Sequence, residues 1–315
     1  MSSILAVDFG GTNIRVAHFD HPTLPPTAQI KKPTLASEGP ESVLQRLKDA
    51  IAELMPDNGT PVSIGIAAPG PLNPYEGIIH SAPNLPGWKN IPLRQQLYEE
   101  FNCPIFLGND ANLAALGEWR HGAGVGTEHM IYITISTGIG GGIISHGHLL
   151  TGSRGLAAEL GHMTIMSDGP QCGCGRFGHI EAAAAGPAIT RNALSRLVAG
   201  EESTLQQAYS DGKIITPVEI AEAARAGDPL SIEVLSQASR LIGHHLADLA
   251  HAFDPELFVL GGGISSIGEL FFAPIRQSLA EHVMDPVYIE GLRVLPAALG
   301  DDAGLIGAMV LADQG

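Results

Sequence analysis

The chain has 315 residues, of which 44% are hydrophobic, so it can bury a substantial core. Its formal net charge of −16 repels phosphate backbones and no run of Lys or Arg offsets it, which argues against nucleic acid as a partner. No apolar stretch reaches the roughly 18 residues of a membrane helix, and the N-terminus lacks the basic and apolar regions of a signal peptide, so we expect no membrane partner.

The N-terminal part of the chain alternates strand-like apolar runs with turns and amphipathic helices. A run of β-type residues from Ile4 is broken by a glycine turn and then resumes, which is typical of strand, turn and strand. Residues 41–55 place their apolar side chains on one helical face. The predicted elements of this part are strands at 4–7, 14–19, 62–67 and 104–107, and helices at 41–55 and from Asn109 to about Arg120.

The same pattern restarts near Met130. The predicted elements of the second part are a strand at 130–136, a glycine turn at 137–142, a strand continuing at 143–144, helices at 217–226 and 229–253, a strand at 257–260 and a closing helix at 305–311. Two similar β-turn-β openings indicate an internal duplication, so we expect an α/β molecule of two lobes with a cleft. We predict a smaller N-terminal lobe at 1–119, joined by the C-terminal helix at about 301–315, and a larger lobe at 120–300.

Three glycine-rich turns lie at the ends of predicted strands. In the first, Asp8-x-Gly10-Gly11-Thr12, backbone N–H groups can approach phosphate oxygens, the threonine adds a donor, and the aspartate can hold Mg²⁺. The second, at 136–142, offers another phosphate cradle, and the third, at 260–265, suits the flat approach of a nucleobase. Each alone is equally typical of an ordinary glycine turn, but three in this order favour nucleotide binding. The P-loop pattern is absent from the sequence.

A candidate catalytic carboxylate follows the strand at 104–107. In Asn109-Asp110-Ala111-Asn112, Asp110 can accept a proton from a sugar hydroxyl as it attacks phosphorus, and Asn109 can bind neighbouring hydroxyls. The alternative is helix N-capping, which Asn and Asp both favour. The two roles are compatible.

A candidate metal site follows Glu159-Leu160-Gly161-His162. Two thiols and two imidazoles at close spacing predict a tetrahedral Zn²⁺ site of His162, Cys172, Cys174 and His179. The alternatives are free buried thiols or a strained disulfide within Cys-Gly-Cys. The sequence has only three cysteines, and such an odd, sparse set argues against a secreted disulfide scaffold, so we expect a cytoplasmic protein.

Other cysteine and histidine residues indicate no site. Cys103 precedes a predicted strand and is interpreted as a packed thiol. His244, His245 and His251 lie on the helix predicted at 229–253, and we interpret them as residues of the helix surface or of an interface.

Taken together, these residues resemble the ROK family of sugar kinases and repressors over essentially the whole chain. The most specific part is Glu-Leu-Gly-His at 159–162, followed by Cys-x-Cys-Gly-x-x-Gly-x-x-Glu at 172–181. The resemblance implies the actin-like ATPase fold, which is ribonuclease H-like, with an active site between its two lobes. The family usually has a third cysteine where this chain has His179. Because imidazole replaces thiolate in many zinc sites, this change puts the affinity in doubt more than the site.

The resemblance also implies the ligands. The residues expected at ATP and its Mg²⁺ are Asp8, Gly10, Gly11, Thr12, Thr137, Gly138, Gly140, Gly261, Gly262 and Gly263. The residues expected at the sugar are Asn84, Asn109, Asp110, Glu159, His162 and Glu181, with Asp110 as the catalytic base. The Zn²⁺ would be structural, because four protein ligands leave no open position for substrate.

The expected activity is ATP-dependent phosphorylation of glucose. The segment from Asn109 to Glu118 looks closest to ROK glucokinases. The alternatives are another acceptor (N-acetylmannosamine, N-acetylglucosamine, fructose or mannose) or a non-catalytic sugar sensor. The chain opens directly on the phosphate motif rather than on a DNA-binding helix-turn-helix, which favours a kinase over a repressor. The family analogy further suggests a homodimer or a dimer of dimers.

Overall fold

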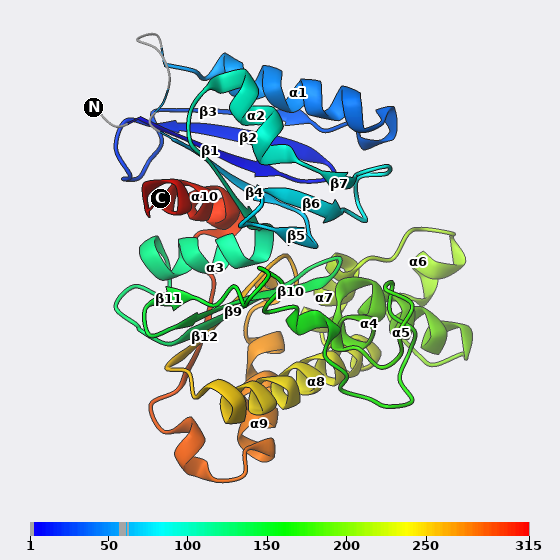
Figure 1. Cartoon of the computed structure of the whole chain (residues 1–315). Coiled ribbons are helices and arrows are strands. Elements are labelled where there is room, and N and C mark those ends of the chain that lie inside the picture. Colours follow the sequence, from blue (N-terminus) through cyan, green and yellow to red (C-terminus); the bar gives the residue numbers. More distant parts are fainter. Residues whose placement is uncertain (1–2, 57–60, 62, 315) are drawn as a thin grey trace. The chain divides into compact units, whose positions relative to one another are not determined.

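The structure, a computed structural model, describes residues 3–56, 61 and 63–314. The chain divides into two compact units (Figure 1). Unit 1 comprises Met1–Gly126, Gly142–Ala158 and Ala298–Gly315, and unit 2 comprises Thr127–Gly141 and Glu159–Ala297. The lobes predicted at 1–119 with 301–315 and at 120–300 stay a prediction.

Unit 1 is built on a five-stranded sheet with the strand order β3-β2-β1-β4-β8. Its strands are β1 (Ile4–Phe9), β2 (Asn13–Phe19), β3 (Ala28–Pro33), β4 (Ser63–Ala68) and β8 (Ile105–Asn109). β1 pairs antiparallel with β2 and parallel with β4, which pairs parallel with β8. The predicted strand–turn–strand opening is therefore confirmed. Val62, the predicted first residue of the third strand, lies outside the described residues.

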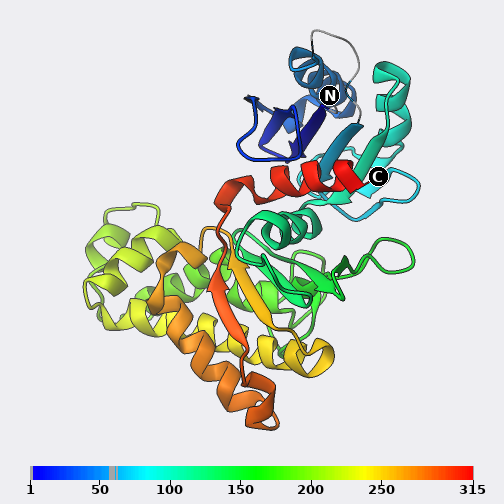
Figure 2. The same cartoon turned by 90° about the vertical axis from the view of Figure 1, so that its left-hand side faces the viewer.

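Helices cover both faces of this sheet (Figures 1 and 2). Alternate side chains of β1 point to opposite faces, so Leu5 and Val7 pack in the cluster that includes α1 and α2, whereas Ile4 and Ala6 pack against α3 and α10. The helices are α1 (Pro40–Glu53), α2 (Leu93–Phe101), α3 (Asp110–His121) and α10 (Ala303–Gln314). A small three-stranded sheet consists of β5 (Leu72–Asn73), β6 (Ile78–Ser81) and β7 (Lys89–Ile91). This packing holds the start of α3 beside the carboxyl ends of β4 and β8.

A second five-stranded sheet has the order β11-β10-β9-β12-β13. Its strands are β9 (Met130–Ile135), β10 (Ile139–Ser145), β11 (His148–Leu149), β12 (Leu257–Gly261) and β13 (Arg293–Pro296). It repeats the strand order of the first sheet, as the predicted duplication requires. The glycine turn predicted at 137–142 is too long, because Gly140 to Gly142 belong to β10. A Cβ on Gly141 would lie 2.5 Å from the Leu160 side chain, so this glycine serves close packing of a strand.

The remaining α-helices belong to unit 2. They are α4 (Ile180–Ala184), α5 (Gly186–Val198), α6 (Gln206–Ser210), α7 (Pro217–Arg225), α8 (Pro229–Phe253) and α9 (Glu269–His282). Short 3-10 helices are η1 (Ala36–Glu38), η2 (Leu160–His162), η3 (Ser265–Ile267), η4 (Pro286–Ile289) and η5 (Gly300–Asp302). The helices predicted at 217–226 and 229–253 are confirmed. The surface prediction for His245 is wrong, because its side chain lies in the core of unit 2 with 2% of its surface exposed.

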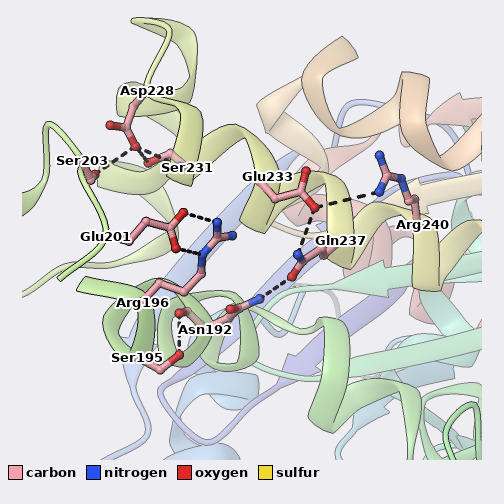
Figure 3. A network of polar contacts seen from close by, with 10 residues as sticks. All are labelled: Asn192, Ser195, Arg196, Glu201, Ser203, Asp228, Ser231, Glu233, Gln237 and Arg240. Atoms are coloured by element: carbon pink, nitrogen blue, oxygen red, sulfur yellow. Dashed lines mark hydrogen bonds and ion pairs between the residues drawn. The ribbon is translucent and has the colours of Figure 1, made fainter. Parts of the chain in front are cut away.

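Polar contacts fix α5 against α8 (Figure 3). Asn192 on α5 donates to Gln237 on α8 at 3.0 Å, and Gln237 donates to Glu233 one turn earlier at 2.9 Å. Asp228, which caps the N-terminus of α8, is 2% exposed and also accepts from the Ser203 hydroxyl at 3.0 Å. These contacts hold in place α5, which lines the cavity of unit 2 described below.

Candidate active site and metal-binding loop

The first glycine turn of unit 1 carries an oriented carboxylate. Asp8, near the end of β1, accepts from Arg15 Nη2 at 2.6 Å and from Arg15 Nε at 3.0 Å, both through its Oδ2 atom. Arg15 also reaches Asp302 of η5 at 2.9 Å. The turn itself closes through a hydrogen bond from Gly10 N to Asn13 O at 2.9 Å. Arg15, which the sequence analysis did not assign to the site, therefore fixes the orientation of the proposed Mg²⁺-binding carboxylate.

The segment containing Asn84 lies against this turn. A Cβ on Gly11 would lie 2.6 Å from the Asn84 carbonyl oxygen, so only glycine allows this approach. Trp88, four residues later, packs on Phe9 of β1 with ring centroids 4.9 Å apart. Unit 1 thus brings Asn84, a predicted sugar-binding residue, beside the turn that is predicted to bind phosphate.

Asn109 and Asp110 mark the junction of β8 and α3. The Asn109 side chain accepts from Ala111 N at 3.0 Å and from Asn112 N at 3.2 Å, so the predicted N-capping role is confirmed for Asn109. Asp110 is the first residue of α3 and is exposed. Its Oδ1 accepts from Ala111 N at 2.8 Å, which holds the carboxylate at the helix N-terminus. The capped helix end gives this exposed carboxylate a fixed position.

In unit 2, Glu181 joins the second glycine turn to the loop that carries Cys172 and Cys174. Its Oε2 accepts from Ile139 N at 3.1 Å, and a Cβ on Gly138 would lie 2.6 Å from the same oxygen. Its Oε1 accepts from the Cys172 thiol at 3.3 Å. The second glycine turn and the loop that carries Cys172 thus together fix the position of the Glu181 carboxylate. Thr137 adjoins Gly138 in this turn.

Glu159 is the N-cap residue of the short helix η2, and His162 is its last residue. Local burial of the carboxylate raises the pKa of Glu159; nearby His162 opposes this effect, and the Glu181 carboxylate adds to it. The other two predicted sugar-binding residues of unit 2, His162 and Glu181, therefore both act on the charge of Glu159. A raised pKa means that Glu159 holds a proton more readily than an ordinary glutamate does.

The four predicted metal ligands come together. The ligand atoms of His162, Cys172, Cys174 and His179 all lie within 4.8 Å of one another. Cys172 Sγ lies 3.6 Å from His162 Nδ1, and Cys174 Sγ lies 3.3 Å from His179 Nδ1. Zn–S and Zn–N bonds of about 2.3 and 2.0–2.1 Å at tetrahedral angles separate sulfur from nitrogen by about 3.6 Å. The donor set and its spacing therefore fit Zn²⁺.

Local backbone contacts shape this loop. Cys172 N donates to Arg176 O at 2.7 Å, and Gly175 N donates to Cys172 O at 2.8 Å, which folds the two cysteines toward one another. His179 is the N-cap residue of α4, and an isolated bridge pairs it with Thr164. Burial raises the pKa of Cys172 to about 11, so binding of a metal would have to displace a proton from this thiol.

A cavity of about 650 Å³ in unit 2 lies beside the second and third glycine turns. Its walls come from α5, α7 and η3, which contribute Thr190, Arg191, Thr216, Val218, Arg225 and Ile264 among others. Ser136, Thr137 and Gly263 also line it. Its mostly apolar wall and its size suit a nucleoside. The residues of α5 and α7 could not be found from the sequence, because nothing in a helical pattern indicates which helix faces a cavity.

The three glycines of the third turn have different environments. A Cβ on Gly261 would lie 2.4 Å from the Tyr132 hydroxyl, and a Cβ on Gly262 would lie 2.4 Å from the Ile135 carbonyl oxygen. Both glycines are therefore required by packing against β9. Gly263 has no heavy atom within 4 Å of such a Cβ, and it lines the cavity. Of the three, Gly263 is the one placed to approach a ligand.

Within the described residues, no helix is both long and apolar enough to cross a membrane.

The predicted site residues distribute over the two units as follows. Unit 1 holds Asp8, Gly10, Gly11, Thr12, Asn84, Asn109 and Asp110, and unit 2 holds Thr137, Gly138, Gly140, Glu159, His162, Cys172, Cys174, His179, Glu181, Gly261, Gly262 and Gly263.

Comparisons with known proteins agree over the whole chain. A family model described as the ROK family matches residues 4–315. A glucokinase of Streptomyces coelicolor is 36% identical over 318 residues, covering 100% of this chain and 98% of the relative. The crystal structure of a ROK family glucokinase from Streptomyces griseus in complex with glucose and AMPPNP has a TM-score of 0.83 and 37% identity, and the match covers 100% of both chains.

Other relatives are named for different functions. An N-acetylmannosamine kinase of Citrobacter koseri is 33% identical and covers 98% of both chains. A xylose repressor of Caldicellulosiruptor bescii is 31% identical over 80% of this chain and 63% of the repressor. The α/β fold with two five-stranded sheets matches the fold of the ROK structures and thus the predicted actin-like ATPase fold.

Proposed function

The chain belongs to the ROK family, and we propose that it is an ATP-dependent sugar kinase that phosphorylates the 6-hydroxyl of glucose. The observation that supports this most is the similarity over the whole chain to glucokinases, one of which was solved with glucose and an ATP analogue. We further propose that it acts in the cytoplasm and that it forms a homodimer or a dimer of dimers. Light scattering of the purified protein tests the proposed oligomeric state.

In the proposed reaction, Asp110 is the catalytic base. As the 6-hydroxyl attacks the γ-phosphorus, its proton passes to the Asp110 carboxylate, a P–O bond to the sugar forms, and the bond from the γ-phosphorus to the bridging oxygen of ADP breaks. The position of Asp110 supports this role, since the capped start of α3 exposes its carboxylate and fixes its backbone.

The proposed nucleotide site uses the glycine turns and the cavity of unit 2. The cavity takes the nucleoside, and the residues assigned to ATP are Asp8, Gly10, Gly11, Thr12, Thr137, Gly138, Gly140, Gly261, Gly262 and Gly263. Mg²⁺ bound with ATP supplies positive charge that offsets the charge of the phosphates. Asp8 would hold it, directly or through water, in an orientation fixed by Arg15.

The proposed sugar contacts are Asn84, Asn109, Asp110, Glu159, His162 and Glu181. His162 Nδ1 faces the Cys172 sulfur, so its other ring nitrogen can bind a sugar hydroxyl while Nδ1 binds the metal. Zn²⁺ held by His162, Cys172, Cys174 and His179 would be structural, because the four ligands fill its tetrahedral shell. Its role would be to hold the loop that leads from His162 to Glu181.

The direct test is an ADP-release assay over a panel of hexoses and N-acetylhexosamines, with phosphate position determined on the product. We expect glucose to give the highest kcat/KM and glucose 6-phosphate as the product. An N-acetylhexosamine that exceeds glucose tenfold would reassign the acceptor, as the N-acetylmannosamine kinase relative allows. Binding of sugar without ADP release from any acceptor would instead indicate a sugar sensor.

A further inference from the structure

The tip of the β5–β6 hairpin contacts the segment that leads into Glu159. The tip joins β5 to β6 at Pro74–Gly77, and the segment is 151–158; both belong to unit 1. The Tyr75 hydroxyl lies 2.8 Å from Gly152 O and 2.7 Å from Thr151 Oγ1. Because its single proton goes to the Gly152 carbonyl, the Thr151 hydroxyl donates to the Tyr75 oxygen.

The hairpin tip is held rigidly from behind. Asn73 Oδ1 accepts from Tyr75 N at 3.0 Å and from Glu76 N at 3.2 Å. Arg94 of α2 donates to Tyr75 O at 2.8 Å and also to Pro74 O. The Tyr75 hydroxyl is therefore presented by a fixed backbone, although 56% of the residue surface is exposed.

The two segments are in close contact beyond the hydroxyl. Gly155 has a φ of +75°, and a Cβ there would lie 2.0 Å from Pro74 Cδ. Only glycine satisfies both the left-handed backbone and the contact. The contact is thus built from two independent features, the Tyr75 hydroxyl and Gly155.

A short path connects this contact to Glu159. Thr151, bonded to Tyr75 through its side chain, accepts from Ala157 N through its carbonyl oxygen at 3.1 Å. Ala158 follows with a φ of +67°, a left-handed conformation that its Cβ disfavours. The next residue is Glu159. The loop closed by Thr151 and Ala157 therefore holds a strained backbone immediately before the carboxylate.

We propose that Tyr75 is a positioning residue for sugar binding, which acts through the closed 151–157 loop to fix the backbone that presents Glu159. This inference rests on the proposed role of Glu159 as a sugar contact. Tyr75 does not touch the sugar or ATP in this scheme. Its loss should weaken sugar binding and leave the chemical step and ATP binding nearly unchanged.

The test compares Tyr75→Phe and Thr151→Val with Tyr98→Phe, a control tyrosine on α2 with a similar exposed fraction of 53%. Loss of a hydrogen bond of this kind corresponds to a roughly 3- to 10-fold rise in the sugar KM. We expect that rise in Tyr75→Phe and Thr151→Val, with kcat and the ATP KM within about twofold. The double variant should be no worse than Tyr75→Phe alone, because that variant already removes the bond that Thr151→Val removes. Thr151→Ser should restore the wild-type value.

Hydrogen exchange separates failure of the inference from failure of the proposed function. In sugar-free protein, the Ala157 amide should exchange several-fold faster in Tyr75→Phe than in wild type or Tyr98→Phe. If no sugar is phosphorylated by wild type, the proposed function fails, and sugar affinity measured by calorimetry replaces KM. Unchanged exchange at Ala157, or faster exchange with unchanged sugar affinity, overturns the positioning role. An equal rise in the ATP KM, or the same effect in Tyr98→Phe, also overturns it.

Discussion

Replacement of Glu118 by glutamine measures how strongly one buried carboxylate stabilises unit 1. Glu118 lies on α3, in the helix that begins with Asp110, and 0% of its surface is exposed. Its Oε1 accepts from Leu299 N at 2.7 Å. Its Oε2 accepts from Ala123 N at 2.9 Å and from Ala298 N at 3.1 Å. One side chain thus joins the end of α3 to the segment that precedes α10.

The expected cost follows from these three contacts. Glutamine keeps the shape but replaces one acceptor oxygen with a donor NH₂ group, whichever way the amide is turned. At least one backbone N–H then faces another donor, and an unpaired buried donor costs about 1–3 kcal/mol. The remaining hydrogen bonds lose their ionic character, which contributes about 1 kcal/mol more. We therefore expect Glu118→Gln to lower the free energy of unfolding by about 2–4 kcal/mol.

Tryptophan fluorescence during urea unfolding is the appropriate assay. The chain has two tryptophans, Trp88 and Trp119, and both belong to unit 1. Glu99→Gln is the matched control, since Glu99 on α2 is exposed and the same substitution there should change stability by less than about 0.5 kcal/mol. A free energy of unfolding for Glu118→Gln within about 0.5 kcal/mol of wild type would show that these buried hydrogen bonds do not stabilise unit 1 as expected.

Three further predictions concern the proposed site and the core of unit 2. Asp110→Asn should lower turnover by roughly 10²- to 10⁴-fold while sugar binding by calorimetry persists; near-normal turnover would exclude Asp110 as the base. His179→Ala should lower the zinc content and raise the sugar KM more than the ATP KM, whereas His179→Cys should keep the zinc content and the sugar KM near wild type. The zinc content is measured by metal analysis with and without chelator. Zinc-free protein with full activity would refute the zinc site. Burial alone would raise the pKa of Asp228, but hydrogen bonds from Ser231, Thr204 and Ser203 lower it overall. Its stabilising effect is therefore complete above the unfolded pKa of about 4 and is lost as the pH falls through the lower folded pKa. Asp228→Asn should flatten the acid limb of stability measured against pH, and an unchanged limb would contradict this.

The sequence predicted elements whose signals are local. The helix predicted at 229–253 has the bounds of α8, because Pro229 starts it and its apolar stripe follows the helical period. The strand–turn–strand openings at β1–β2 and β9–β10 were predicted from apolar runs and glycines. The four predicted zinc ligands were correctly predicted to cluster, because their donor chemistry and short spacing are both visible in the chain.

Two local interpretations were wrong because packing decided them. Gly140 belongs to strand β10, and a Cβ on the adjacent Gly141 would lie 2.5 Å from the Leu160 side chain, so Gly141 serves close packing of a strand rather than a turn. His245 was predicted at the helix surface or at an interface, yet it lies in the core of unit 2, and burial lowers its pKa to about 4. A histidine on a helix has no sequence signal that says which neighbour covers it. The roles of the predicted site residues stay predictions until the assays above are done.

The sequence by itself determined the family, the two repeated openings and the residue types of the candidate site, because these depend on identity and short spacing. Only the tertiary structure decided which distant groups meet. Glu118 accepts hydrogen bonds from residues 180 and 181 positions away, and Tyr75 reaches Thr151 across 76 positions. The cavity of unit 2 is lined from four separate stretches of the chain, around Ser136, Thr190, Thr216 and Ile264. Such contacts depend on how whole helices and strands pack, and no local pattern of residues specifies that packing.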